Sequence, residues 1–179
     1  FFYRPDAQDV LMVGLAAGYS AGAITLHPAS RIDIVEIEEE IIEASGFFDE
    51  WNHRPLEDPR VNMLVNDARN HLMLTAKGTY DIIVSEPSNP WLTGVSNLFT
   101  REYFELGRSR LKEGGVFSQW IQIYGMDVGD LRSLLGTFSD SFAYVHLFST
   151  ISDADLVLVG SDSPLALSVS GFQRVIDTN

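Results

Sequence analysis

The hydrophobic positions near the start of the chain predict a strand, a helix and a second strand in close succession. An apolar run over residues 10–13 (VLMV) predicts a buried strand, and a second run over residues 32–35 predicts another. Between the two runs, Ala23, Ile24 and Leu26 follow helical spacing. A strand, a helix and a strand in this order are typical of one half of an α/β sheet.

Small residues form the turn between the first strand and the helix. Gly14, Ala16 and Gly18 follow the strand directly, although Ala16 stands where a GxGxxG pattern would have its second glycine. Small residues let the backbone approach a ligand closely, and a helix N-terminus offers unpaired N–H groups. Glu36 ends the second strand, roughly 20 residues further on, where an acid can accept hydrogen bonds from ribose hydroxyls. This stretch therefore predicts a nucleoside-binding half of an α/β sheet.

Helix and strand patterns continue to alternate along most of the remaining chain. The expected helices are residues 38–46, a helix that begins at Ala68 after Asn66 and Asp67, residues 100–112, and a helix from Asp127 to 138. Residues 47–59 and 86–97 are expected to be loops, because they are rich in proline and polar residues. The remaining expected strands are residues 61–65, 80–85, 116–123, 142–148 and 155–159.

The last two expected strands are joined by a short turn around Ser152 and Asp153, so they must run antiparallel. The sequence thus predicts an α/β fold with a seven-stranded, mostly parallel sheet, a C-terminal antiparallel hairpin and helices on both faces. A nicotinamide-binding Rossmann fold would keep alternating strands and helices. The hairpin instead favours the Rossmann-like fold of S-adenosylmethionine-dependent methyltransferases.

Composition and charge exclude several classes of function. The 179 residues fit one domain, and no apolar run reaches the roughly 18 residues of a membrane span. The formal net charge of −13 argues against nucleic-acid binding and would attract a cationic substrate. The chain has no cysteine, which excludes disulfides, thiolate chemistry and Cys-ligated zinc. No metal site is expected, because the four histidines show no ligand spacing: His27, His53, His71 and His146.

Both ends of the sequence are those expected of a segment taken from a longer chain. The chain starts on Phe1 rather than methionine, and residues 170–179 begin a helix-like pattern that stops. We expect a single domain, residues 1–179, taken from a longer protein that can include membrane spans.

Residues 10 to about 164 resemble the spermidine/spermine synthase (aminopropyltransferase) family, and most closely its bacterial branch that is often fused to membrane segments. The motifs that carry the resemblance are VLMVGLAAGYSAGAITLHP, VEIEEEII, NDARNHL, YDIIVSEPSNPW, LFTREYFEL and LKEGGVFSQW. The resemblance implies a cytoplasmic transferase of polyamine biosynthesis that uses S-adenosylmethionine or its decarboxylated form, a small-molecule amine as acceptor and no metal. The family's small N-terminal β-domain, which helps it dimerise, is missing from this sequence. The sequence therefore leaves open whether the chain forms a homodimer.

The resemblance also assigns roles to single residues of the donor site. Gly14, Ala16 and Gly18 would line the nucleoside pocket, and Glu36 would hold the ribose. The remaining donor contacts would come from Ile37 beside the adenine, and from Asp67 and the backbone of Ala68 at its amino group. From the residues alone, Glu36 can equally be an exposed acid, and Asp67 can be simply a helix N-cap.

On the acceptor side, the resemblance gives Glu86 the place of the aspartate that helps deprotonate the attacking amine. Asn89 stands where a second aspartate holds the diamine, and Tyr103 matches an aromatic position near that pocket. Glu86 can instead be a solvated loop acid, or cap a turn through Ser88. The aromatic residues Trp91, Trp120 and Tyr124 can stack on adenine, line an amine pocket or simply pack.

Three departures from the family pattern leave the reaction open. Ala17 replaces an acid that contacts the amine tail of decarboxylated S-adenosylmethionine, Glu86 is one methylene longer than aspartate, and Asn89 lacks its charge. Aminopropyl transfer to an amine is the first hypothesis. Methyl transfer from intact S-adenosylmethionine is the second, because alanine at position 17 does not repel the donor's carboxylate. The third is a non-catalytic nucleoside-binding domain of a larger membrane protein.

Overall fold

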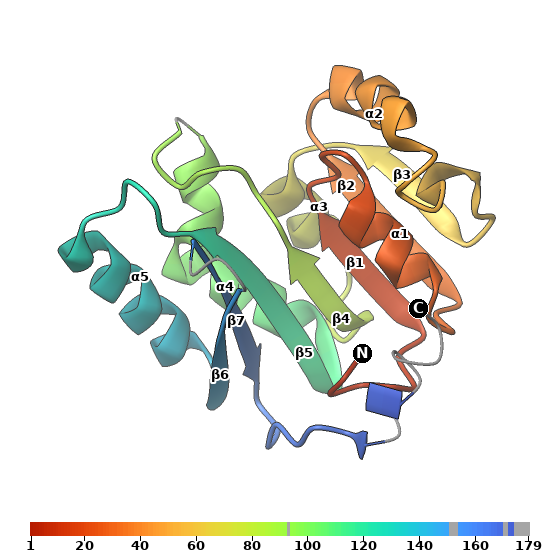
Figure 1. Cartoon of the computed structure of the whole chain (residues 1–179). Helices are drawn as coiled ribbons and strands as arrows, with labels where there is room; N and C mark the ends of the chain where they lie inside the picture. The colour runs from red at the N-terminus through yellow and green to blue at the C-terminus, as the bar shows by residue number, and fades with distance from the viewer. Residues whose placement is uncertain (93, 151–153, 170–171, 174–179) are drawn as a thin grey trace.

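A computed structural model describes residues 1–92, 94–150, 154–169 and 172–173. Within these ranges the chain forms one seven-stranded sheet with strand order β3-β2-β1-β4-β5-β7-β6 (Figure 1). The strands are β1 (Asp9–Val13), β2 (Arg31–Glu36), β3 (Val61–Val65), β4 (Tyr80–Ser85), β5 (Leu111–Gln122), β6 (Tyr144–Ser149) and β7 (Asp155–Ser161).

The helices fill the connections between the strands, as the sequence predicts. They are α1 (Tyr19–Thr25), α2 (Glu39–Ser45), α3 (Ala68–Leu74), α4 (Arg101–Arg110) and α5 (Val128–Ser141), with short 3-10 turns η1 (Gly46–Phe48), η2 (Pro55–Glu57) and η3 (Val95–Phe99). Asp127 caps α5 through hydrogen bonds from the backbone of Gly129 and Asp130. Across the part of the chain that the structure describes, every helix is too short or too polar to cross a membrane.

Strand direction agrees with the prediction of a mostly parallel sheet. Strands β1 to β5 pair in parallel, and β7 pairs antiparallel with both β5 and β6. The strand order reverses between β1 and β4, which are neighbours although two strands separate them in sequence. Open α/β sheets bind ligands at the carboxyl ends of the strands where the order reverses in this way. The fold therefore places the candidate site above β1 and β4.

Some predicted boundaries are wrong, mainly around β5. This strand begins at Leu111 and includes Gly114 and Gly115, which we expected to separate helix from strand. The pairing register with β4 shifts between Tyr80 and Ile82, and glycines in a strand commonly mark such irregularities. Both expected loops contain 3-10 turns, η2 in the first and the start of η3 in the second. The turn at residues 152–153 and most of the helix-like pattern at 170–179 fall outside the described residues.

Two hydrophobic clusters cover the two faces of the sheet, which confirms helices on both sides. Alternate strand residues point to opposite faces, so neighbouring positions of one strand enter different clusters. In Figure 1, α1 lies in front of the sheet, and α3 and α4 lie behind it. The cluster on the α1 side includes Val10, Met12, Ile24, Ile32, Ile34 and Ile82, and the cluster on the other side includes Leu72, Ile83, Phe104, Phe117, Phe138 and Leu158.

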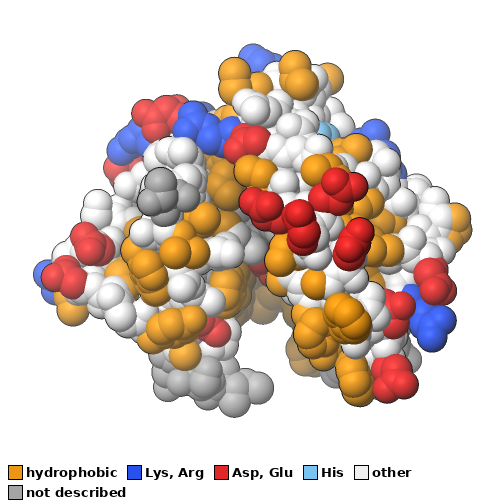
Figure 2. Space-filling model, turned by 90° about the horizontal axis from the view of Figure 1, so that it is seen from above, with side chains coloured by type: hydrophobic (Ala, Val, Ile, Leu, Met, Phe, Trp, Pro, Cys, Tyr) orange, Lys and Arg blue, Asp and Glu red, His pale blue; other side chains and the backbone are white. Residues whose placement is uncertain are grey.

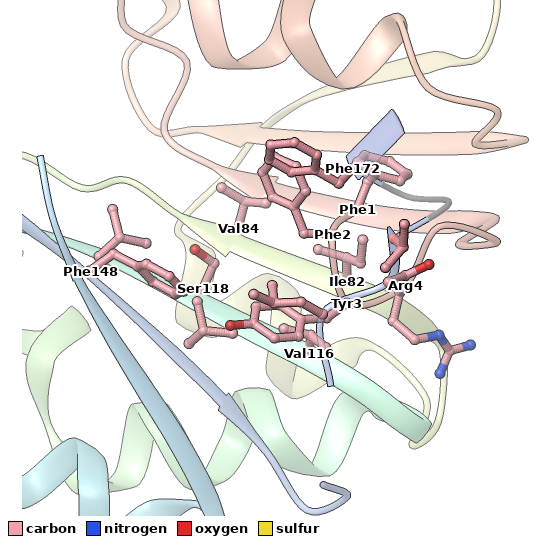
Figure 3. Close-up of a pocket in the computed structure, with 15 residues that line it drawn as sticks. Phe1, Phe2, Tyr3, Arg4, Ile82, Val84, Val116, Ser118, Phe148 and Phe172 are labelled. Carbon is pink, nitrogen blue, oxygen red and sulfur yellow. The ribbon is translucent and has the colours of Figure 1, made fainter. Parts of the chain in front are cut away.

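On the face that carries α1, the two terminal segments lie over β4, β5 and β7 and border an apolar groove (Figure 3). The groove has a volume of about 600 Å³. The rings of Phe2 and Phe172 meet there with centroids 5.6 Å apart, and the N–H of Ser168 donates to the carbonyl of Phe2 over 2.9 Å. From the strands, the groove is lined by Ile82, Val84, Val116, Ser118, Phe148, Val157 and Val159.

Candidate active site above β1 and β4

The turn between β1 and α1 has an unusual backbone. Gly14 and Gly18 have φ angles of 87° and 81°, and Ala16 between them has a φ angle of 48°. Alanine in this left-handed region costs roughly 1–2 kcal/mol relative to the right-handed one. The turn is held in place by hydrogen bonds from the N–H of Gly14 to the carbonyl of Val35 and from Gly18 to Leu15, both 2.9 Å. Strain of this kind is found preferentially at ligand sites.

Glu36 lies at the end of β2 and binds this turn directly. Its Oε2 atom accepts from the N–H of Leu15 over 2.9 Å, while Oε1 accepts from Ile37 over 2.8 Å and Glu38 over 3.2 Å. The residue is only 9% exposed, so the alternative of a merely exposed acid is wrong. A carboxylate oxygen has two lone pairs, and Oε2 therefore keeps the capacity to accept from a ligand hydroxyl.

The other predicted donor residues gather at the same edge of the sheet. The N–H of Asn66 donates to the carbonyl of Glu36 over 3.0 Å, which joins the ends of β2 and β3. Asp67 caps α3, because its Oδ1 atom accepts from the N–H of Asn70 over 2.9 Å. Ala68 is buried and Ile37 is exposed. The N-cap prediction is confirmed, and the acids at positions 36 and 67 follow adjacent strands.

Glu86 follows β4 and faces the turn of β1 and α1. Its N–H donates to the carbonyl of Val13 over 2.9 Å, which continues the pairing of the two strands. Burial raises the pKa of the Glu86 carboxyl, and a hydrogen bond with the Ser20 side chain in the first turn of α1 offsets part of this rise. The carboxyl group therefore points toward α1 rather than capping a turn at Ser88. A half-buried carboxyl group therefore lies beside the turn of residues 14–18.

The two remaining acceptor-side candidates lie in different surroundings. Asn89 is half-buried in the loop after β4, and its carbonyl accepts from the N–H of Leu92 over 3.0 Å. Tyr103 of α4 is fully buried, and its hydroxyl lies 3.0 Å from the hydroxyl of Ser85. Burial raises the pKa of Tyr103. The structure thus places Asn89 at the carboxyl-end edge and Tyr103 behind β4, on the side of α4.

Among the aromatic candidates, Trp91 and Tyr124 pack against each other. Their ring centroids are 6.2 Å apart in an edge-to-face arrangement, and each residue is about half exposed. They join the loops that follow β4 and β5. Figure 2, viewed from above, shows hydrophobic side chains and a group of acidic side chains on this face. The exposed acids of α2 are Glu39, Glu40 and Glu43, and no group of three or more metal-ligating side chains occurs among the described residues.

Sequence reasoning missed Asn52, which lies in a segment predicted only as a loop. Asn52 is fully buried. Its Nδ2 atom donates to the carbonyls of Ala17, over 3.0 Å, and Ser45, over 3.2 Å, and its Oδ1 atom accepts from the N–H of Arg54 over 2.9 Å. Asn52 therefore joins the turn of residues 14–18 to the segment that follows α2. Nothing in the local sequence marks its contact with the turn, because Ala17 lies 35 residues away along the chain.

Comparison with known proteins shows the family of the chain. Residues 1–153 match the family model described as the spermine/spermidine synthase domain. A polyamine aminopropyltransferase of Nitrosomonas europaea is 29% identical over 183 residues, covering 97% of this chain and 55% of the relative. Putrescine N-methyltransferase 1 of Nicotiana tabacum is 30% identical over 113 residues, covering 63% of this chain and 30% of the relative.

A solved structure shows the same fold. The spermidine synthase of Thermotoga maritima superposes with a TM-score of 0.80 at 20% identity, covering 97% of this chain and 58% of that protein. The chain thus spans between about a third and just over half of the length of these proteins.

Proposed function

We propose that this chain, which belongs to the spermine/spermidine synthase family, transfers the aminopropyl group of decarboxylated S-adenosylmethionine to a small-molecule amine. The observation that carries the proposal is the position of Glu86. Its carboxyl group lies at the carboxyl end of β4, where the strand order reverses. It is half-buried and lies beside the turn of residues 14–18, which we call the donor turn. A base at this place can act on an amine that approaches a donor bound at the turn.

The donor is proposed to lie across the carboxyl ends of β2, β1 and β4. Glu36 would accept hydrogen bonds from the ribose hydroxyls, and the second lone pair of its Oε2 atom supports this role. Asp67 and the backbone at Ala68 would meet the adenine amino group, with Ile37 against the ring. Gly14, Ala16 and Gly18 would leave room for the nucleoside, because none of them has a side chain beyond Cβ.

The reaction balances as one displacement and one proton transfer. The nitrogen lone pair of the neutral amine attacks the propyl carbon next to the sulfonium, a C–N bond forms, and the C–S bond breaks. The electron pair of that bond stays on sulfur, so the donor leaves as neutral methylthioadenosine. The extra proton on the nitrogen passes to the carboxylate of Glu86. Most of the acceleration would come from holding the two reactants in line.

Methyl transfer from intact S-adenosylmethionine is the second candidate, and Ala17 favours it. An acid at position 17 would repel the donor's carboxylate, and alanine does not. The Nicotiana relative named as a putrescine N-methyltransferase shows that an amine methyltransferase shares this sequence pattern. In that reaction the same nitrogen attacks the methyl carbon, and the leaving thioether is S-adenosylhomocysteine.

Calorimetric titration with S-adenosylmethionine, its decarboxylated form and methylthioadenosine separates these candidates. Aminopropyl transfer predicts tighter binding of the decarboxylated donor and formation of methylthioadenosine with putrescine. Tighter binding of the intact donor, with methylation of the amine, would replace the first proposal by the second. Nucleoside binding without amine binding or turnover would instead indicate a non-catalytic nucleoside-binding domain.

A further inference from the structure

The strand β6 forms one edge of the sheet, and its outer side has no neighbouring strand among the described residues (Figure 1). Next to the pairing of β6 with β7, the N–H of Thr150 donates to the carbonyl of Asp155 over 3.1 Å. Thr150 thus directs its backbone groups toward β7. Because successive residues of an antiparallel strand alternate in this direction, Val145 and Leu147 direct their N–H and C=O groups away from the sheet.

This edge lacks the features that usually prevent a strand from pairing further. Natural proteins protect edge strands with charged side chains, prolines or bulges. The sequence of β6, YVHLFS, contains no Asp, Glu, Lys, Arg or Pro. Its register with β7 runs without a shift from Tyr144 to Ser149. Tyr144, Leu147 and Phe148 are also 44%, 50% and 41% exposed, so the edge offers both backbone groups and apolar side chains to another strand.

The charge of the chain indicates which strand fits this edge. With 25 acidic and 12 basic residues, two copies of the chain repel each other over most of their surface. The repulsion is weakest where neither copy carries a charged side chain, and β6 is such a place. A basic partner would find no opposite charge on this strand. The best complement of an uncharged apolar strand is an equally uncharged one, such as β6 of a second copy.

Symmetry also favours pairing of β6 with itself over pairing with the other edge of the sheet. Two antiparallel copies of one strand are related by a two-fold axis, and such an interface closes at two subunits. The opposite edge is β3. Pairing of β6 with β3 of the next copy would be head-to-tail and would continue into open chains. A closed dimer is therefore the arrangement that this edge supports in a soluble state.

We propose that two copies of this chain form a dimer by antiparallel pairing of their β6 strands, which joins the two sheets into one. The two-fold axis passes beside Leu147, so that this residue lies opposite Leu147 of the second copy. Residues paired in this way exchange two backbone hydrogen bonds and have Cα atoms about 5.5 Å apart. The half-exposed side chains of Leu147 and Phe148 lose contact with water in the pair. The inference does not depend on the proposed reaction.

Analytical ultracentrifugation at micromolar concentrations tests the proposal, and the wild type should sediment as a reversible dimer. Leu147→Lys places two like charges opposite each other at the axis, so we expect the dissociation constant of the dimer to rise at least about tenfold. Val65→Lys is the matched control, because Val65 is 56% exposed and lies in β3 at the other edge. This control should dimerise like the wild type, and circular dichroism checks that both variants are folded.

A cysteine variant tests the position of the axis independently of the lysine variants. The chain has no cysteine, so Leu147→Cys introduces its only thiol. Since Cα atoms about 5.5 Å apart are within disulfide range, mild oxidation should give a covalent dimer that a reductant reverses, whereas Val65→Cys should stay mostly monomeric on a denaturing gel. A monomeric wild type, a dimer that Leu147→Lys does not weaken, or equal cross-linking of both cysteine variants would overturn the inference. Open-ended oligomers weakened by both lysine variants would also overturn it, because they would indicate pairing of β6 with β3.

Discussion

A Cβ atom added to Gly14 would lie 2.6 Å from the backbone carbonyl oxygen of Glu86. The donor turn and the carboxyl end of β4 are therefore in direct backbone contact, with no side chain between them. Gly14 also has a φ angle of 87°, which side chains disfavour. The position of the proposed base thus depends on a glycine more than 70 residues earlier in the sequence.

Gly14→Ala should be strongly destabilising, by about 3 kcal/mol or more. The left-handed backbone alone accounts for roughly 1–2 kcal/mol, and the clash with Glu86 must displace either the turn or the strand end. Denaturant unfolding measures the difference. Gly78→Ala is the control, because Gly78 has a φ angle of 65° but open space around the added Cβ. Similar losses in both variants would show that the contact with Glu86 has no effect on stability.

Glu36→Gln should weaken both the fold and nucleoside binding. The carboxylate accepts from three backbone N–H groups, and an amide would turn an NH₂ group toward some of these donors. We expect a loss of about 1–3 kcal/mol in the free energy of unfolding and at least about tenfold weaker binding of methylthioadenosine. Glu38→Gln is the control, because Glu38 is a nearby exposed acid. Calorimetry measures the methylthioadenosine affinity of both variants. Unchanged nucleoside affinity in Glu36→Gln would refute the ribose contact.

Asp67 can be tested for its two roles separately. Asp67→Asn keeps an oxygen that can cap α3, so stability should stay within about 0.5 kcal/mol of wild type, whereas Asp67→Ala should lose about 1 kcal/mol. If the second carboxylate oxygen binds the adenine amino group, both variants should bind methylthioadenosine more weakly. Normal binding by Asp67→Asn would leave Asp67 with the capping role alone.

Glu86→Gln should become more stable relative to wild type as the pH rises. Burial raises the folded-state pKa of Glu86 above its unfolded value, so the folded state holds this proton more tightly. That contribution is fully present below the unfolded pKa, near 4.3 in model peptides, and is lost as the pH rises through the folded pKa. Unfolding of both proteins at several pH values between about 4 and 7 measures the divergence.

Exposed Glu105→Gln supplies the control for this pH series, and its difference from wild type should vary less with pH. A constant difference between Glu86→Gln and wild type would contradict the raised pKa. In the proposed reaction, Glu86→Gln should also lower kcat by about 10²-fold or more, as loss of a general base does.

Asn52→Ala should loosen the donor turn from a distance. The substitution leaves two carbonyls and one N–H without their partner, and we expect a loss of about 3 kcal/mol. The control is Asn70→Ala, because Asn70 is exposed on α3. Hydrogen exchange should show faster exchange at residues 14–18 in Asn52→Ala only. Unaltered exchange there would mean that the turn holds without Asn52.

The strands and helices were largely predictable because local patterns define them. β3 and β4 begin and end where the apolar runs do, and Asp67 and Asp127 cap α3 and α5 as predicted. The start of β5 was not predictable from local pattern, since Gly114 and Gly115 resemble a helix end and only pairing with β4 keeps them in the sheet. The β1–α1 turn and the spacing of Glu36 also predicted a site at the sheet edge where, in the structure, the strand order reverses between β1 and β4.

The sequence by itself determined the order of the elements, the antiparallel final pair and the edge where the candidate acids gather, because periodicity, caps and short connections are encoded within a few residues. Only the tertiary structure decided that Glu86 turns toward Ser20 and that Asn52 holds the turn of residues 14–18 in place. Each of these facts depends on groups from separate strands or loops. Such contacts form when the sheet is assembled, and no local pattern records them.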